Sequence, residues 1–373
     1  MIKRRTFLQH STLTAVSTTA LAACSRKPPT PSEPVSSPAQ PFVRWRMATS
    51  WPKSLNLTFG AAEQLCQRVS RLTNGRFAIT PYAAGEIVSG LEVLPAVEAG
   101  TVECGHTASY YYIDRVPALA FATTVPFGLN AQQQQAWLHS GEGLALMQNL
   151  YADFGVRNFP GGSTGAQMGG WFKREVNTLA DLKGLKMRIP GLGGQVMGRL
   201  GMEVQVLLGN QIFDALDGNK LDAAEWVGPY DDEQLGLNRV APFYYFPGWW
   251  EPGTTYEFQV NLAAWQKLPS QYQEAFEVAA AQANCQMLAN YDAANGQALQ
   301  RLLARGTKLR EFSPEILQAA ENVTFELYEE KASQDPTFKQ IYQQWKAFRS
   351  QVYQWHRVNE LGFVSFAFQT LDS

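Results

Sequence analysis

From Phe42 onwards, hydrophobic and polar positions alternate in a way that predicts strands and helices in turn. The stretch VRWRMATSW predicts a strand ending near Ser50, and LTFGAAEQLCQRVSRLTNG predicts a helix that stops at Asn74-Gly75. The segments RFAITPY, GLEVLPAVEAG and VECGHTA then predict a strand, a helix closed by Gly100, and a third strand. This β-α-β-α-β run indicates a mostly parallel sheet with helices on both faces.

A second unit of the same kind follows later in the chain. The predicted strands LKMRIP, MEVQVLL and LDAAEW are separated by the predicted helices GGQVMGRLG and QIFDALDGNK. The stretches AVEAGTVECGHTA and ALDGNKLDAAEWV share an apolar-acidic helix end, a glycine break and an apolar-acidic strand opening. We therefore predict an α/β fold with two lobes of related topology. Since ligands of open α/β sheets bind beyond the carboxyl ends of the strands, a ligand cleft is expected between the lobes.

Polar side chains are expected to point into this cleft. Arg188 ends the predicted strand LKMRIP, Glu225 and Trp226 end LDAAEW, and Gln167 is expected on a strand that crosses between the lobes. Glutamate is rarely buried unless it is paired. Because no lysine or arginine lies within four residues of Glu225, we expect its partner to be a metal ion. A basic side chain elsewhere is the alternative.

Composition and charge exclude several classes of protein. The chain has 373 residues, 45% of them hydrophobic, which is enough for a large core and two or three domains. With a net charge of −2 and no basic run beyond the first few residues, no nucleic-acid partner is expected. None of the four histidines has metal-ligand spacing, and no glycine-rich phosphate loop is present. A binding protein that catalyses nothing is therefore expected.

The N-terminal residues 1–24 predict an export signal. The pair Arg4-Arg5 before Phe7-Leu8 resembles a twin-arginine signal, and the LAAC stretch ending at Cys24 resembles a bacterial lipobox. This resemblance implies acylation of Cys24 and a periplasmic protein anchored to the membrane by lipid. A plain signal peptide with a chance cysteine is the alternative. Residues 25–42, rich in proline and serine, predict a disordered tether.

The three remaining cysteines give no disulfide framework, because their number is odd and their spacing is wide. Cys66 and Cys285 fall in predicted helices, where we expect both to be buried as small hydrophobic residues. A disulfide between Cys66 and Cys104 is the alternative for that pair.

The C-terminal third predicts long helices. The stretch from Leu268 to Gly306 begins with Pro269-Ser270 and has Gln273 at a capping-box position, with Gly296 as a possible kink. In the last predicted helix, apolar residues recur with 3-4-3-4-3 spacing: Phe338, Ile341, Trp345, Phe348, Val352 and Trp355. This a/d seam predicts either packing on the chain's own body or a partner helix, and a homodimer is expected.

Eight blocks, in order along the chain, carry a resemblance to a known family. They are ATSWP (48–52), AAGEIV (83–88), HTASYYY (106–112), PFGLN (126–130), GGSTGAQMGGWF (161–172), GLKMRIPG (184–191), AAEWVGPYDDE (223–233) and APFYYFPGWWE (241–251). The sequence resembles the substrate-binding proteins of tripartite ATP-independent periplasmic (TRAP) transporters, and within them the branch that binds 2-oxoacids such as pyruvate. The resemblance implies a two-lobe periplasmic-binding-protein-like fold, a long spine helix, a C-terminal dimerisation helix and delivery of the ligand to membrane permease subunits.

The resemblance also implies roles for single residues. Arg188 matches the arginine that pairs with the ligand carboxylate, and the run Tyr110, Tyr111, Tyr112 matches pocket-lining residues. Gln167, Glu225 and the backbone carbonyl of Trp226 match the ligands of a cation, commonly Na⁺, with Ca²⁺ possible. Guanidinium binds carboxylate through two parallel hydrogen bonds, and hard cations take oxygen ligands, so the residue types suit these roles. Another organic acid, aromatic or dicarboxylate, a polyol, or a ligand-sensing receptor domain is the alternative.

The expected organisation combines both lines of reasoning. After the signal and tether, lobe I spans residues 43–165 and lobe II spans residues 166–252. Residues 253–295 return to lobe I and form the spine helix. Residues 296–373 complete lobe II and form the C-terminal helix.

Overall fold

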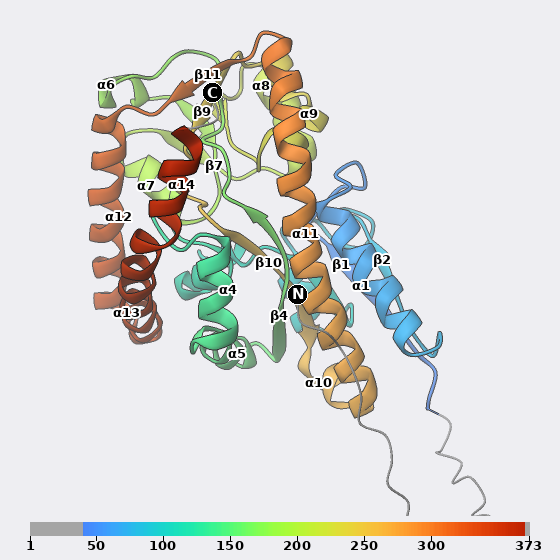
Figure 1. The fold of residues 1–373 in the computed structure, drawn as a ribbon. Coiled ribbons are helices and arrows are strands. Elements are labelled where there is room, and N and C mark those ends of the chain that lie inside the picture. Colours follow the sequence, from blue (N-terminus) through green and yellow to red (C-terminus); the bar gives the residue numbers. More distant parts are fainter. Residues whose placement is uncertain (1–39, 370–373) are drawn as a thin grey trace, which may run out of the picture. The chain divides into compact units, whose positions relative to one another are not determined.

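The computed structural model describes residues 40–369, which fold around two β-sheets (Figure 1). The first sheet has the order β2-β1-β3-β10-β4, and the second has the order β11-β9-β5-β8-β6-β7. The strands of the first sheet are β1 (Val43–Thr49), β2 (Phe77–Tyr82), β3 (Cys104–Thr107), β4 (Val156–Gly165) and β10 (Thr254–Asn261). Those of the second are β5 (Trp171–Phe172), β6 (Lys186–Arg188), β7 (Glu203–Gln205), β8 (Ala223–Ala224), β9 (Phe243–Phe246) and β11 (Lys308–Glu311).

The predicted β-α-β-α-β unit is present in the first sheet. Strands β1, β2 and β3 pair in parallel, connected by α1 (Thr58–Leu72) and α2 (Val93–Glu98). Helix α1 buries Phe59, Leu65 and Val69 at helical spacing. It ends where Asn74 and Gly75 take positive φ angles of 51° and 75°, as their place at a helix stop predicts. Strand β10 is antiparallel to both β3 and β4.

The second sheet repeats this arrangement with shorter strands. Strand β6 pairs in parallel with β7 and β8, with α7 (Gly191–Arg199) and α8 (Gly209–Asp217) as the connections. Strand β5 is antiparallel to β8 and β9, much as β10 is antiparallel to its two neighbours in the first sheet. The prediction of two α/β units with related topology is confirmed.

The chain passes between the two sheets at two adjacent short segments and again through the helices between β10 and β11. Residues 166–170 lead from β4 to β5, and residues 247–253 return from β9 to β10. The segments pair with each other, because the Gln167 amide donates to the Glu251 carbonyl at 3.1 Å and the Gly248 amide donates to the Gln167 carbonyl at 3.1 Å. The expectation that Gln167 lies on a strand was wrong, since its backbone pairs with the other crossing segment and not with a sheet neighbour.

Helix α11 (Ser270–Ala304) is the longest helix of the described residues and passes without interruption through Gly296. It appears in orange in Figure 1 beside α1 and β4, which it contacts. The predicted capping box is absent, because Pro269 is the N-cap and Gln273 instead donates to the Trp265 carbonyl at 2.8 Å. The other helices before it are α3 (Ala120–Thr123), α4 (Ala131–Ser140), α5 (Gly143–Ala152), α6 (Leu179–Leu182), α9 (Pro229–Leu235) and α10 (Leu262–Gln266).

The C-terminal helices are α12 (Pro314–Gln334), α13 (Pro336–Val358) and α14 (Glu360–Gln369). The predicted apolar seam lies on α13, and only its first half is buried. Phe338, Ile341 and Trp345 of α13 are buried in the chain's own core, so this half of the seam packs intramolecularly. Phe348 and Val352 pack on that core while half-buried, and Trp355 is 60% exposed. The exposed apolar surface continues through α14, which has no buried residue.

Of the two cysteines predicted to be buried, one is buried and the other is exposed. Cys66 is buried as expected, but Cys285 is exposed, so its predicted burial was wrong. Its neighbours Asn284 and Met287 occupy the buried face of α11 instead. Cys66 and Cys104 are both free thiols, and burial raises the pKa of each. The predicted signal, lipobox and most of the tether lie outside the described residues, within which no helix has the length and apolar character to span a membrane.

Candidate functional site

The candidate site lies beyond the carboxyl ends of the strands, where the two crossing segments meet them. Strand β6 ends at Arg188, and β8 ends directly before Glu225 and Trp226. The backbones of these strand ends are joined, because the Glu225 amide donates to the Arg188 carbonyl at 3.1 Å. From the first sheet, β3 leads into the short helix η1 (Ser109–Tyr112), which carries the predicted tyrosines.

Arg188 is buried, with 1% of its surface exposed, and is held on several sides. Its Nε donates to the Leu207 carbonyl at 3.1 Å, and Nη1 donates to the Glu225 carbonyl at 2.8 Å and to the Glu225 carboxylate. The guanidinium also lies over the Trp226 ring, 4.9 Å from its centroid. These contacts leave Nη2 without a hydrogen-bond partner among the described residues. The guanidinium is thus fixed in orientation with one donor group available.

Glu225 has a basic partner after all. Its Oε1 forms an ion pair with Arg188, and the second oxygen, Oε2, has no hydrogen-bond partner in residues 40–369. No local sequence pattern indicates this partner, because the pair joins neighbouring strands of the sheet and its two members are 37 positions apart in the chain. Burial raises the pKa of Glu225, and the guanidinium of Arg188 opposes that shift. A role of Glu225 as a cation ligand remains a prediction.

Gln167 presents its amide oxygen in a defined direction. Its Nε2 donates to the hydroxyl of Thr164 at 3.1 Å and to the hydroxyl of Thr254 at 3.2 Å. The amide oxygen, Oε1, is buried and has no partner among the described residues. Met168, the next residue, donates its amide to the carbonyl of Val227 at 3.1 Å, which ties this crossing segment to the chain that follows Glu225.

The three predicted tyrosines have different surroundings. The Tyr110 and Tyr111 rings meet edge to face, with centroids 4.9 Å apart. Tyr110 packs against Gly191 at the start of α7, where a Cβ would lie 3.2 Å from the Tyr110 Cβ. Burial raises the pKa of Tyr111 to about 12, while the charge of Arg188 opposes that shift. The Tyr112 hydroxyl instead bonds to Thr107 and to the Leu94 amide inside the first sheet's layer. Tyr110 and Tyr111 are therefore the two that face the Arg188 region.

Glu251 is a buried carboxylate at the site that the sequence analysis did not assign. It is 3% exposed, and its Oε2 accepts a hydrogen bond of 2.7 Å from the Thr254 hydroxyl. Burial raises its pKa to about 7, against the opposing influence of Thr254, Arg188 and Gln167. A signal was present, because EWVGP and WWEPG both set a glutamate beside tryptophan and close to a glycine and a proline.

Asp231 and Asp232 form a further buried acidic pair in the first turn of α9. The Tyr291 hydroxyl donates to Asp231 at 2.7 Å, and Tyr244 and Trp171 donate to Asp232 at 2.7 and 2.9 Å. Burial raises the pKa of Asp231 to about 7 and that of Asp232 to about 6. Both carboxylates thus lie at the N-terminus of a helix, where the helix dipole favours negative charge.

The donor atoms fit a hard cation of low charge. Two buried oxygens that have no hydrogen-bond partner within residues 40–369, Gln167 Oε1 and Glu225 Oε2, belong to the residues predicted as cation ligands. Amide, carboxylate and carbonyl oxygens are the ligands that Na⁺ and Ca²⁺ take in proteins. No group of three or more His, Cys, Asp or Glu side chains in the described part of the chain could hold a metal.

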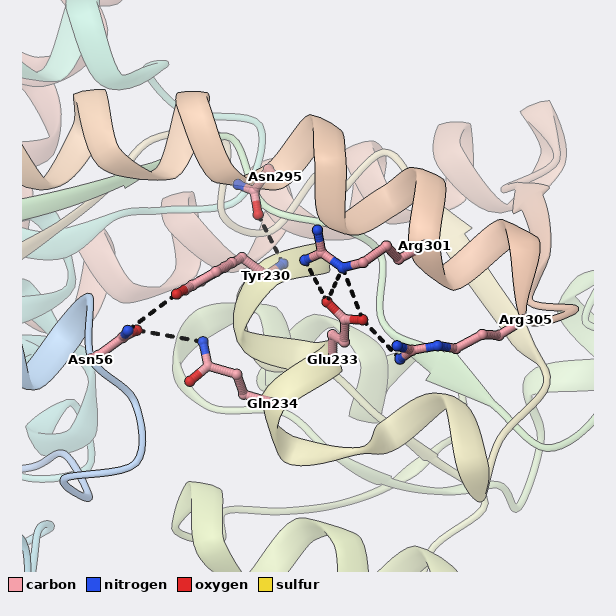
Figure 2. A network of polar contacts seen from close by, with 7 residues as sticks. All are labelled: Asn56, Tyr230, Glu233, Gln234, Asn295, Arg301 and Arg305. Atoms are coloured by element: carbon pink, nitrogen blue, oxygen red, sulfur yellow. Dashed lines mark hydrogen bonds and ion pairs between the residues drawn. The ribbon is translucent and has the colours of Figure 1, made fainter.

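A second polar network connects segments that flank different sheets (Figure 2). Asn56, which follows β1, donates to the Tyr230 hydroxyl at 3.1 Å and accepts from Gln234 at 3.5 Å. Both partners lie on α9, which follows β8 of the second sheet. The Tyr230 amide donates to Asn295 of α11 at 3.0 Å. The network therefore joins both lobes at the edge of the candidate site.

Glu233 anchors α9 to the long helix in the same network. Its carboxylate accepts from Arg301 at 2.6 Å and from Arg305 at 2.8 Å, and both arginines lie at or just beyond the end of α11 (Figure 2). These ion pairs lower the pKa of Glu233.

This two-lobe α/β fold, with a buried arginine and buried side-chain oxygens near the segments that join its sheets, is the fold of an extracytoplasmic solute-binding protein. The model of the bacterial extracellular solute-binding proteins, family 7, matches residues 47–335, and the chain belongs to this family. A monocarboxylate 2-oxoacid-binding periplasmic protein of Nostoc sp. is 62% identical over 366 residues, which are 98% of this chain and 99% of that protein. The family resemblance seen in the sequence and the predicted fold class are thereby confirmed.

Solved structures give the same result. A TRAP transporter solute-binding protein of Bordetella bronchiseptica is 45% identical, with a TM-score of 0.88 over 89% of this chain and 99% of that one. It is described as a mixed-occupancy dimer with calcium and picolinate in one active site. TRAP solute-binding proteins of Colwellia psychrerythraea, with calcium and pyruvate, and Pseudoalteromonas atlantica, with sodium and pyruvate, are each 36% identical. Each has a TM-score of 0.85 over 87% of this chain and 99% of its own.

Proposed function

We propose that this protein captures a small monocarboxylate, most simply a 2-oxoacid such as pyruvate, for a TRAP transporter. The observation that carries the proposal is the buried Arg188 guanidinium, whose Nη2 has no partner among the described residues and lies beside the Glu225 carboxylate. A guanidinium with an available donor group binds a carboxylate through charge-assisted hydrogen bonds. Tyr110 and Tyr111 close this region from the first sheet, and the names of the Nostoc and Colwellia proteins support the same ligand class.

A cation binds together with the ligand in this proposal. Gln167 Oε1, Glu225 Oε2 and the Trp226 carbonyl would hold it, and oxygens of the ligand would complete its shell. A cation supplies positive charge that separates the Glu225 carboxylate from the ligand carboxylate, which would otherwise repel each other. Sodium and calcium are the candidates, since structures of relatives contain one or the other with pyruvate.

The protein acts by binding and release, without catalysis. The best-placed histidine, His106, is fully buried, accepts from Trp51 Nε1 at 2.9 Å and contacts the Gly161 carbonyl at 3.2 Å. Burial lowers its pKa to about 3, and both ring nitrogens are engaged within the core, so His106 is a neutral core residue. Ser109 does not pair with this histidine, because its hydroxyl bonds to the Leu119 carbonyl and the Thr123 hydroxyl instead.

The remaining parts of the proposal concern the location and partners of the protein. It is exported to the periplasm, is anchored there through an acylated Cys24, and delivers the ligand to membrane permease subunits. It forms a homodimer through the exposed apolar surface of α13 and α14, where Trp355, Phe363 and Phe366 are 60 to 70% exposed. A dimer in the Bordetella structure supports this.

Calorimetric titration of the mature protein tests the ligand class. Pyruvate and 2-oxobutyrate should bind, whereas succinate, glutamate and mannitol should not. Picolinate belongs in the panel, because an aromatic carboxylate is the main alternative. Preference for a dicarboxylate or a polyol would refute the 2-oxoacid proposal and leave the transporter family unchanged. Repeating the pyruvate titration in sodium, calcium and choline buffers after chelation tests the cation, and equal affinities in all three would refute it.

A further inference from the structure

The cation site of the proposed function depends on the orientation of one side-chain amide. Gln167 can serve as a ligand only through its oxygen, because the amide nitrogen carries two protons and no available lone pair. A free glutamine can turn its amide by 180° at little cost, which would aim the nitrogen at the cation. The site therefore needs a device that holds the Gln167 amide in one of its two orientations.

The structure contains such a device on the far side of the amide. The Thr164 hydroxyl donates to the Gly165 carbonyl at 3.0 Å, and the Thr254 hydroxyl donates to Glu251 Oε2 at 2.7 Å. A hydroxyl has one proton, so each of these two groups is left only as an acceptor toward Gln167. Both therefore require the Nε2 of Gln167, at 3.1 and 3.2 Å, and the flipped amide would set its oxygen against two acceptors.

The residues that form this hydrogen-bond chain are buried, so their hydrogen bonds are costly to break. Gln167, Thr254 and Glu251 are at most 4% exposed, so water does not replace a lost partner easily. The other end of the same amide is its oxygen, which is buried and has no partner in the part of the chain that the structure describes. This hydrogen-bond chain also connects the two crossing segments, which share a backbone hydrogen bond of 3.1 Å between Gln167 and Glu251. A substitution of Glu251 is therefore expected to affect Gln167 through the Thr254 hydroxyl.

We propose that Thr254 and Glu251 are positioning residues for the cation site: Glu251 accepts the hydrogen bond that the Thr254 hydroxyl donates, and Thr254 thereby holds the Gln167 amide with its oxygen toward the cation. The inference rests on the proposed function, since it assumes that Gln167 is a cation ligand. Glu251 has a second effect through its charge. Coulomb energy scales with the product of the charges, so the Glu251 carboxylate attracts Ca²⁺ twice as strongly as Na⁺ in free energy.

Replacing the threonine separates positioning from charge. The variant Thr254→Val keeps the shape and removes the hydroxyl, so it should weaken Ca²⁺ and Na⁺ binding to a similar extent, by roughly 10- to 100-fold. Thr254→Ser restores the hydroxyl and should bind both cations within about threefold of wild type. Thr324→Val is the matched control, because Thr324 is another fully buried threonine whose hydroxyl donates to a carbonyl, that of Ala320, within α12.

Replacing the glutamate tests the charge. Glu251→Gln should weaken both cations, and the factor for Ca²⁺ should approach the square of the factor for Na⁺, for example roughly ninefold against threefold. This variant also keeps the proposal testable if Thr254→Val fails to fold. A Ca²⁺ loss no larger than the Na⁺ loss would refute the charge effect of Glu251.

The measurement is calorimetric titration of the full mature protein with CaCl₂ and NaCl, each alone and with saturating pyruvate, after chelation. Circular dichroism and apo-protein melting temperature check the fold of each variant. If Thr254→Val and Thr254→Ser bind cations equally well, the positioning role is wrong. If wild type binds neither cation under either condition, the proposed function's cation site fails instead, so the two failures are distinguishable.

Discussion

Arg188 and Glu225 form an ion pair between neighbouring strands of the second sheet, and each side chain is 1% exposed. Each member keeps one polar atom, Nη2 and Oε2, without a partner among the described residues. A buried ion pair is costly to desolvate, and leaving donors and acceptors unmade adds to that cost. The pair is therefore better explained as a binding site for an anion and a cation than as a device for stability.

Replacing Arg188 with alanine should nearly abolish pyruvate binding. Loss of one partner of a buried, hydrogen-bonded charge pair costs roughly 2–5 kcal/mol, or about 30- to several-thousand-fold in affinity. Arg188→Lys should give a smaller loss, because it keeps the charge without the planar fork. Calorimetry measures both, with circular dichroism as the check on folding. A loss under about threefold for Arg188→Ala would mean that the ligand carboxylate binds elsewhere.

Asn56→Ala should weaken ligand binding without touching the site. The Asn56–Tyr230 hydrogen bond joins the two lobes, so it stabilises the arrangement of the lobes in which it forms, in proportion to its net strength. A single hydrogen bond contributes roughly 0.5–1.5 kcal/mol, which predicts a loss of about 2- to 10-fold, mainly through faster release. Stopped-flow release of pyruvate measures this.

Two variants define whether the Asn56 effect comes from this contact. Tyr230→Phe removes only the hydroxyl, and the double variant Asn56→Ala/Tyr230→Phe should lose no more than the larger single loss. Asn177→Ala, at an exposed asparagine of the second lobe, should bind as wild type does. Fully additive losses in the double variant would show that the two side chains act separately.

Glu257 should make stability fall as pH rises toward neutrality. Burial raises its pKa from 4.5 to about 7, although Tyr151 and Asn158 donate to its carboxylate at 2.6 and 2.5 Å. The folded state thus binds this proton more tightly than the unfolded state. Its stabilising contribution is complete below about pH 4.5 and is lost as pH rises to about 7. The loss amounts to roughly 3 kcal/mol.

The variant Glu257→Gln tests that pH dependence. It lacks the titrating group, and the Asn158 oxygen, which has no partner among the described residues, can accept from the new amide. Urea unfolding between pH 4.5 and 8 should therefore show a flatter stability profile than wild type. Glu326→Gln, at an exposed glutamate, is the control. Parallel profiles for wild type and Glu257→Gln would contradict the raised pKa.

Polar replacement of the exposed C-terminal residues should convert the proposed dimer into a monomer. The triple variant Trp355→Ser/Phe363→Ser/Phe366→Ser leaves the core intact, whereas truncation before Phe338 would remove buried residues of α13. Size-exclusion chromatography with light scattering measures the mass. Val278→Ser, on the exposed side of α11, should stay dimeric. A monomeric wild type at micromolar concentration would refute dimerisation through this surface.

The sequence by itself determined the elements and the ends of the strands that matter. Hydrophobic periodicity and glycine stops are local properties, so the order of strands and helices and the position of Arg188 at the end of β6 could be read from neighbouring residues. The roles expected for Gln167, Glu225 and the tyrosines came from the family resemblance, which is carried by blocks that can be read directly from the sequence.

The tertiary structure decided which of these groups meet. The partner of Glu225 is 37 residues away, and the chain from Glu251 through Thr254 to Gln167 joins two crossing segments that no local pattern connects. It also turned Tyr112 inward and divided the α13 seam into a buried half and an exposed half. Contacts of this kind depend on how the strands are ordered and paired, which brings distant residues within hydrogen-bond distance and is not encoded in the spacing along the chain.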